Sequence, residues 1–177
     1  MTGGGSGDPR GHGAAAVRTR RGCPADLDQV NALHGRCTPS SLSSRYHGAL
    51  RRISPADWRR LVDPAHGVTW VMQEDRCPDD VIAVAHLMRT GVDGVAELGI
   101  LVEDSRQGRG LGTRLVGQVL DHAAAAGCHT VTATVQAGNV PMLRIALGFG
   151  APRPRGAAVM DLRIPVGPGG VPGSASR

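Results

Sequence analysis

The stretch RQGRGLGTRL, residues 106–115, constrains the fold of this chain more than any other segment. Its three glycines alternate at Gly108, Gly110 and Gly112, after an apolar run and before residues with helical periodicity. A glycine-rich turn of this kind exposes backbone N–H groups at the positive end of a helix, where phosphate binds. A tight turn packed on its own helix is the alternative, but it does not require three alternate glycines. We therefore predict a strand–loop–helix unit that holds an anion.

Two common phosphate-binding motifs do not fit this stretch. All 20 of the Lys and Arg residues are arginine, so the chain lacks the lysine that a P-loop requires. The dinucleotide-binding fingerprint requires a glycine where Thr113 stands, and it usually follows the first strand of a domain. The neighbouring Arg106, Arg109 and Arg114 would instead add positive charge beside a diphosphate.

The segments around this unit predict an α+β or α/β sandwich. Apolar and β-branched runs predict strands, and apolar residues three and four apart predict helices. The predicted strands are residues 14–20, 67–73, 81–89, 95–102, 129–135 and 157–164, and the predicted helices are residues 24–37, 54–62, 111–126 and 139–147. Turns at residues 77–80 and 90–94 are short, so the three strands that they connect should form an antiparallel meander.

Length and composition indicate one domain. The chain has 177 residues; residues 1–13 and 167–177 are rich in glycine, proline or serine and should be disordered tails, which leaves residues 14–166 for the fold. No apolar run approaches the roughly 20 residues of a membrane helix, and the N-terminus lacks a signal segment, so we expect a cytoplasmic protein without membrane contact. The cysteines and histidines show no metal-ligand spacing, so no metal is expected.

The charge balance limits the choice of partner. A formal net charge of +5 favours anionic partners, but aromatic residues make up only 2% of the chain, too few for a base-stacking surface. We therefore expect no nucleic acid as partner. An arginine-rich nucleic-acid binder is the alternative, and its binding would weaken steeply with salt.

The segment ELGILVEDSRQGRGLG resembles the acetyl-CoA-binding segment of the GNAT superfamily of N-acetyltransferases. The family signature begins with Gln or Arg, continues with any two residues, Gly and any one residue, and ends with Gly or Ala. It is matched here by Gln107, Gly110 and Gly112. The later segment NVPMLRIALGFG resembles a second family segment, and its matching positions are Asn139, Met142, Gly148 and Phe149.

The resemblance covers nearly all of residues 14–166. It is closest to the bacterial protein-lysine acetyltransferase branch, which is similar at AELGILVEDSRQGRGLG and, more weakly, at TPSSLSSRYHGALRRIS. It implies a GNAT fold with a mixed, mostly antiparallel sheet, and acetyl-CoA as cosubstrate. It also implies direct transfer of the acetyl group to a primary amine, such as a protein lysine.

The resemblance also implies roles for individual residues. Glu97 stands at the position of the general base, and its place in an apolar strand predicts burial and a raised pKa. An edge position that faces solvent or pairs with an arginine is the alternative for Glu97. The strand that ends at Val102 should splay from its neighbour, and the N–H of Leu101 would face the thioester carbonyl. A tyrosine that protonates the leaving thiolate in many members is missing here, with Ala146 near its place. The residues implied to bind acetyl-CoA are Ile100, Leu101, Val102, Gln107, Gly108, Arg109, Gly110, Leu111, Gly112, Thr113, Asn139 and Met142.

The acceptor amine is less well specified. Helices within residues 24–62 would form one wall of its groove, and they carry more arginine than aspartate. That charge favours an acidic protein surface around a target lysine, or an amine that carries its own carboxylate. A small-molecule amine or amino-acid acetyltransferase and an acyl-CoA-binding module without turnover are the alternatives. A homodimer is left open as the assembly.

Overall fold

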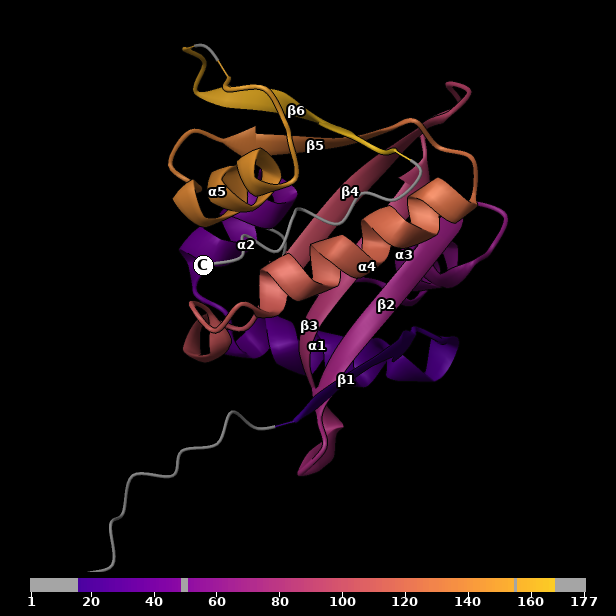
Figure 1. The fold of residues 1–177 in the computed structure, drawn as a ribbon. Helices are drawn as coiled ribbons and strands as arrows, with labels where there is room; N and C mark the ends of the chain where they lie inside the picture. Colours follow the sequence, from indigo (N-terminus) through magenta and orange to yellow (C-terminus); the bar gives the residue numbers. More distant parts are fainter. Residues whose placement is uncertain (1–15, 49–50, 155, 168–177) are drawn as a thin grey trace, which may run out of the picture.

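The computed structural model describes residues 16–48, 51–154 and 156–167 (Figure 1). The tails predicted at residues 1–13 and 167–177 lie outside these ranges, apart from Gly167. Within the described ranges, no helix has the length and apolar character needed to cross a membrane.

Six strands form one sheet in their sequence order. They are β1 Val17–Arg21, β2 Gly67–Glu74, β3 Cys77–Arg89, β4 Val95–Val102, β5 Thr130–Gln136 and β6 Val159–Pro165. Neighbouring strands are antiparallel except β4 and β5, which are parallel. The predicted mixed, mostly antiparallel sheet and its central meander are therefore confirmed.

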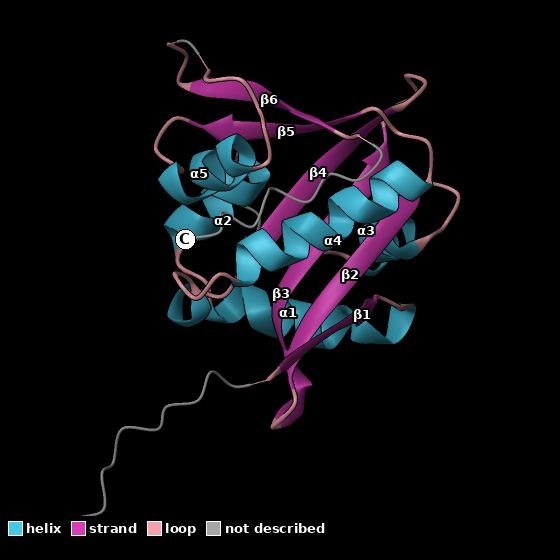
Figure 2. Cartoon of the chain, in the orientation of Figure 1, coloured by secondary structure: helices cyan, strands magenta, loops and turns pink. Residues whose placement is uncertain are grey.

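Helices cover both faces of this sheet (Figure 2). The described residues form α1 Leu27–Arg36, α2 Pro39–Tyr46, α3 Pro55–Val62, α4 Leu111–Ala125 and α5 Val140–Gly148, with short 3-10 helices at Pro24–Asp26 and Asp104–Arg106. One core packs α4 and α5 on the sheet through residues such as Leu115 and Met142. The other packs α1, α2 and α3 on the opposite face through Leu33, Leu42 and Trp58. Burial of these two apolar layers holds the α+β sandwich together.

The sheet opens between β4 and β5. Only Val95, Ala96 and Glu97 of β4 pair with β5, and Glu97 faces Thr132 in the last pair that the two described strands form. Figure 1 shows β4 running obliquely to β5 and β6 beyond this point. The expected splay is therefore present, and it leaves one edge of residues 98–102 without a neighbouring strand among the described residues.

The turn predicted at residues 77–80 is wrong. The chain turns at Asp75 and Arg76, and Cys77 already pairs with Glu74. The register shifts on both sides of Gln73, whose side-chain amide donates to the carbonyl of Pro78. An irregular ladder accommodates Pro78, because proline has no N–H to donate.

Helix α2 is missing from the sequence-based prediction. Its start carries ordinary signals, since the Thr38 hydroxyl accepts from the Ser41 N–H at 3.2 Å and Pro39 is the first helical residue. Leu42 is its only buried residue, so the segment has no apolar stripe from which a helix could be predicted.

Candidate active site

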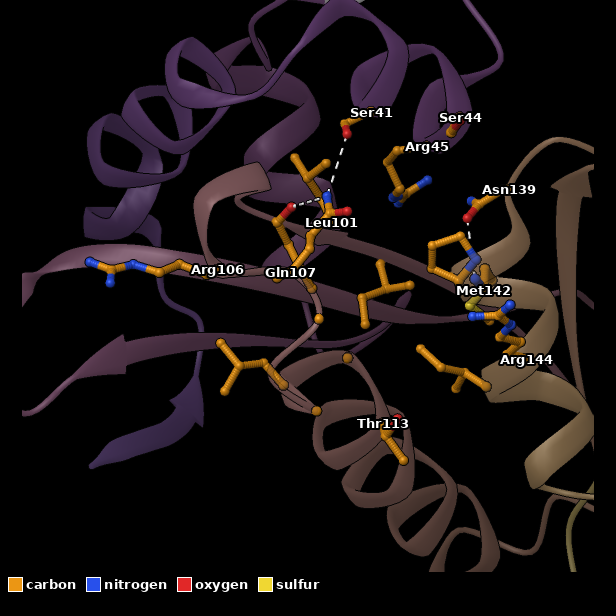
Figure 3. Close-up of a pocket in the computed structure, with 18 of the residues that line it drawn as sticks. Ser41, Ser44, Arg45, Leu101, Arg106, Gln107, Thr113, Asn139, Met142 and Arg144 are labelled. Atoms are coloured by element: carbon orange, nitrogen blue, oxygen red, sulfur yellow. Dashed lines mark hydrogen bonds between the residues drawn. The ribbon is translucent and has the colours of Figure 1, made fainter. Parts of the chain in front are cut away.

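A cavity of about 500 Å³ lies where the open edge of β4 meets the start of α4 (Figure 3). Its walls come from α2, the end of β4, the glycine loop and the start of α5. Every residue implied to bind acetyl-CoA lines this cavity except Arg109, which is exposed beside it. Three segments that are distant in the sequence, within residues 40–45, 100–113 and 138–145, thus converge on one space, as in an ordinary ligand site.

The three alternate glycines have two different structural reasons. Gly108 and Gly110 have φ of 73° and 76°, a left-handed conformation that glycine adopts without the steric cost of a side chain. Gly112 lies inside α4, and a Cβ there would stand 3.0 Å from Cδ1 of Ile145. The first two glycines therefore shape the loop, and the third lets α5 approach α4.

The N-terminus of α4 faces the cavity without a side-chain cap. Gly110 is the N-cap residue and has no side chain, and the first helical hydrogen bond runs from Arg114 N–H to the Gly110 carbonyl at 3.0 Å. The amides of Leu111, Gly112 and Thr113 precede that bond, so they are available to a ligand. With the positive end of the helix dipole behind them, they form an anion site.

The loop before the glycines is fastened to α2 and β4. Gln107 Nε2 donates to the Val102 carbonyl at 3.0 Å and to Ser41 Oγ at 3.4 Å. The Asp104 carboxylate accepts from the Thr38 N–H at 2.9 Å and from Ser41 Oγ at 2.8 Å. Burial opposes ionisation of Asp104, but these hydrogen bonds outweigh it and lower its pKa. The loop is thus held in place before any ligand arrives.

The arginines are arranged differently from the sequence-based expectation. Arg106 borders the cavity, but its guanidinium pairs with Glu74 at 3.0 Å and points away from the glycines (Figure 3). Arg109 donates to the Ser105 carbonyl at 3.1 Å and lies outside the cavity lining. Arg144 of α5, which the motifs do not single out, lines the cavity instead.

The open edge of β4 presents the backbone of Ile100 and Val102. In an antiparallel ladder, alternate residues direct their N–H and C=O to the same neighbour. The N–H of Glu103 donates to the Ile82 carbonyl of β3 at 2.9 Å. The backbone N–H and C=O of Leu101, two residues earlier, therefore also point toward β3. The carbonyl of Val102 points the other way and bonds Gln107. Ile100, rather than Leu101, therefore directs its amide into the splay.

Glu97 is exposed, so the burial expected for it is not found. It lies on the same face of β4 as Gly99 and Leu101, at the point where β4 and β5 separate. Helix α2 covers Gly99 through Arg45, and among the described residues this cover does not extend to Glu97. Glu97 does not line the cavity itself but stands at the closed end of the splay that leads from it.

Asn139 and the chain's single tyrosine have defined structural partners. Asn139 Oδ1 accepts from the Met142 N–H at 3.2 Å, so Asn139 caps α5 and also lines the cavity. The Tyr46 hydroxyl lies 2.7 Å from His34 Nε2, and its ring packs beside the core that carries α1–α3. Ala146 is fully buried, so α5 offers no acid at the position where many relatives carry tyrosine.

The comparisons with known proteins agree with this geometry. The acetyltransferase (GNAT) family model matches residues 27–149. The GNAT domain of S. lividans PAT is similar at 22% identity and a TM-score of 0.73, over 84% of this chain and 90% of that one. YncA of Salmonella typhimurium, solved with its cofactor acetyl-CoA, is similar at 16% identity and a TM-score of 0.65, over 90% of this chain and 99% of that one.

A longer relative is also similar. The cAMP-binding acyltransferase of Mycobacterium smegmatis is 28% identical with a TM-score of 0.60, and the match covers 86% of this chain but only 44% of that protein. The family match spans well over half of the chain, and the splay and the glycine loop lie within the matched segment. This chain therefore belongs to the acetyltransferase (GNAT) family and is an acetyl-CoA-dependent N-acetyltransferase.

Proposed function

We propose that the cavity holds acetyl-CoA with its diphosphate at the start of α4 and its pantetheine arm along β4. The uncapped amides of α4 fit a diphosphate, and the open β4 edge fits the peptide-like amides of the arm, which pair with it as a strand would. The residues that would hold it are Ile100, Leu101, Val102, Gln107, Gly108, Gly110, Leu111, Gly112, Thr113, Asn139 and Met142, with Arg109 beside the loop.

The acceptor in this proposal is a primary amine that attacks the acetyl group directly. The bound thioester supplies an activated acetyl group with a thiolate as leaving group. An alkylammonium has a pKa near 10.4, so it must lose a proton before its nitrogen can form the new C–N bond. The amide of Ile100 donates a hydrogen bond to the carbonyl oxygen on which negative charge develops.

Glu97 is the proposed base. Its carboxylate stands at the closed end of the splay, three residues before Ile100, which is about 10 Å along a strand. At that distance it receives the proton through water, and its exposure keeps such water present. Since Tyr46 is held by His34 and α5 offers no acid, the leaving thiolate takes its proton from water or from the amine.

One observation carries this proposal: the glycine loop, the open edge of β4 and Glu97 lie in order along a single strand–loop–helix unit. The two acceptor classes that follow are a lysine of another protein and a small-molecule amine. Likeness to the protein-lysine branch supports the first class, and Arg45, the one charged residue of α2, suits an acceptor with negative charge near its amine.

The test is release of free thiol from acetyl-CoA against a panel of lysine-bearing proteins and small amines. The enzyme has no lysine, so any acetyl-lysine detected belongs to the acceptor protein. We expect thiol release with members of at least one class, matched by acetylated amine in equal amount. Binding of acetyl-CoA without turnover on either class would contradict the proposal and favour a binding module.

A further inference from the structure

Arg45 lines the cavity and has no role in the proposed acetyl transfer. It is the second-last residue of α2, and its side chain extends from the helix into the cavity (Figure 3). Its guanidinium lies directly over Gly99 of β4, where a Cβ would overlap with Cζ and Nη2. Glycine at residue 99 therefore provides the space that this guanidinium occupies.

The charge of Arg45 has no ionic partner among the described residues. No carboxylate there lies within 4 Å of its guanidinium, and its Nε is buried without a hydrogen-bond partner. The ring of Tyr46 lies 4.7 Å from Cζ, which compensates only part of the lost hydration. The residue as a whole is only half-buried, but its Nε is shielded from water, and a cation in such a place ordinarily has a paired anion. This arrangement points to an anion that is part of the reaction.

The two histidines nearest Arg45 add no positive charge to it. His34 and His86 lie close enough that its charge, after burial, lowers the pKa of each. Both imidazoles are therefore neutral at pH 7. Burial lowers the pKa of Arg45 itself, and Tyr46 and Glu97 raise it in part, so Glu97 is the carboxylate that acts on it through space.

Glu97 and Arg45 together match the charges of an amino acid. Glu97 and Gly99 are alternate residues on one face of β4, so the Glu97 carboxylate and the guanidinium over Gly99 are neighbours along the strand, about 7 Å apart at the backbone. A carboxylate attracts an ammonium, and a planar guanidinium forms two parallel hydrogen bonds with a carboxylate. An α-amino acid carries these two groups on the same carbon atom.

We propose that Arg45 binds the carboxylate of the acceptor, so that the acceptor is an α-amino acid or a short amine bearing its own acid group. The inference rests on the proposed function, because the amine must pass its proton to Glu97 through water while Arg45 holds the carboxylate. Arg45 then orients the amine toward the splay, and it discriminates against amines that lack an acid group.

The experiment compares acceptors in pairs that differ only by the carboxylate. L-phenylalanine is paired with phenethylamine and L-leucine with isoamylamine, each with acetyl-CoA, and kcat/KM is measured for both members. The wild-type ratio should favour the amino acid by roughly 10- to 100-fold, the usual effect of one hydrogen bond to a charged group. Arg45→Gln should bring the ratio close to one, and Arg45→Lys should restore part of it.

A second readout does not depend on turnover. Calorimetry on the protein with bound CoA compares N-acetyl-L-phenylalanine with N-acetylphenethylamine. The first should bind more tightly by a similar factor in the wild type, and Arg45→Gln should remove that difference. Arg60→Gln is the matched control, because Arg60 is an exposed arginine of α3 outside the cavity lining; it should leave both ratios unchanged.

The outcomes separate this inference from the proposed function. Equal kcat/KM for the two members of each pair would overturn the carboxylate subsite and leave acetyl transfer intact. Turnover confined to lysine-bearing proteins would overturn it as well. The wild type could instead prefer succinyl-CoA to acetyl-CoA when phenethylamine is the acceptor, and Arg45→Gln could remove that preference. Arg45 would then bind a carboxylate of the acyl group, which would overturn the acceptor subsite. No turnover with any amine would overturn both.

Discussion

Glu97 and Thr132 form the last pair of the parallel ladder between β4 and β5. The Thr132 hydroxyl donates to the Ala96 carbonyl at 3.2 Å and so reinforces the ladder at the point where it ends. Beyond this pair, the edge of β4 is open as far as the glycine loop. The residue proposed as base therefore stands at a fixed place along β4, at the closed end of the splay between β4 and β5.

Replacing Glu97 with glutamine tests its role as base. Glu97→Gln should lower kcat/KM by about 100- to 10,000-fold, the usual contribution of general base catalysis, and leave acetyl-CoA affinity within about twofold. Thiol release between pH 6 and 10 measures the first quantity and calorimetry the second. Asp121→Asn, at an exposed carboxylate of α4, is the control and should not change either. An unchanged rate at neutral pH would remove Glu97 as base.

Gly110 and Gly127 allow the loop conformation to be tested against a matched glycine. Their φ values are 76° and 81°, and neither has a heavy atom within 4 Å of the Cβ position, so alanine should cost each a similar free energy of unfolding of about 1–2 kcal/mol. Calorimetry should then show weaker acetyl-CoA binding for Gly110→Ala and unchanged binding for Gly127→Ala. Equal affinities would argue against an anion site at residues 107–113.

Gly99 and Arg45 should behave as one unit. Alanine at residue 99 would push the guanidinium out of its place, and because that group ends a flexible side chain, we expect the free energy of unfolding to change by less than about 1 kcal/mol. The preference for carboxylate-bearing acceptors should nevertheless fall as far as in Arg45→Gln. The double variant should fall no further, because residues in contact are not additive. An additive loss would show that the two residues act separately.

The buried histidine His34 should make the fold sensitive to mild acid. Burial, with the charges of Arg45 and Arg52, lowers its pKa from 6.5 to about 4. As pH falls, the unfolded chain takes up this proton first, so the stabilisation is complete above pH 6.5 and is lost between pH 6.5 and 4. The loss from this group amounts to about 3 kcal/mol. Urea denaturation at several pH values should show this decline, and His34→Gln should make it smaller, leaving the part that comes from the buried His86, whose pKa burial also lowers. An identical pH slope in the variant would exclude His34.

The parts of the site that the sequence predicts are those coded by local patterns. The strand before the loop, the glycines and the helix after them are contiguous, so their periodicity and backbone requirements appear directly in residues 95–126. Asn139 as cap of α5 is predictable for the same reason, because the capping side chain and the amide it binds are three residues apart.

The parts that the sequence does not predict depend on contacts between distant segments. Helix α2 buries only Leu42, so no local stripe marks it, and the place of Arg45 over Gly99 follows from packing across 54 positions of sequence. The pairing of Arg106 with Glu74 and the exposure of Glu97 are likewise set by neighbours in space. A pattern in one strand cannot indicate which helix ends above it.

Backbone amide NMR during titration with acetyl-CoA tests the central claim most directly. The amides of Ile100, Gly110, Leu111, Gly112 and Thr113 should shift at a common dissociation constant, because these residues line one cavity and their N–H groups face it without a ladder or helix hydrogen bond. Gly127 and the residues of α3 should stay unchanged. Saturable binding whose shifts fall elsewhere, or no binding at all, would contradict the assignment of this cavity as the acetyl-CoA site.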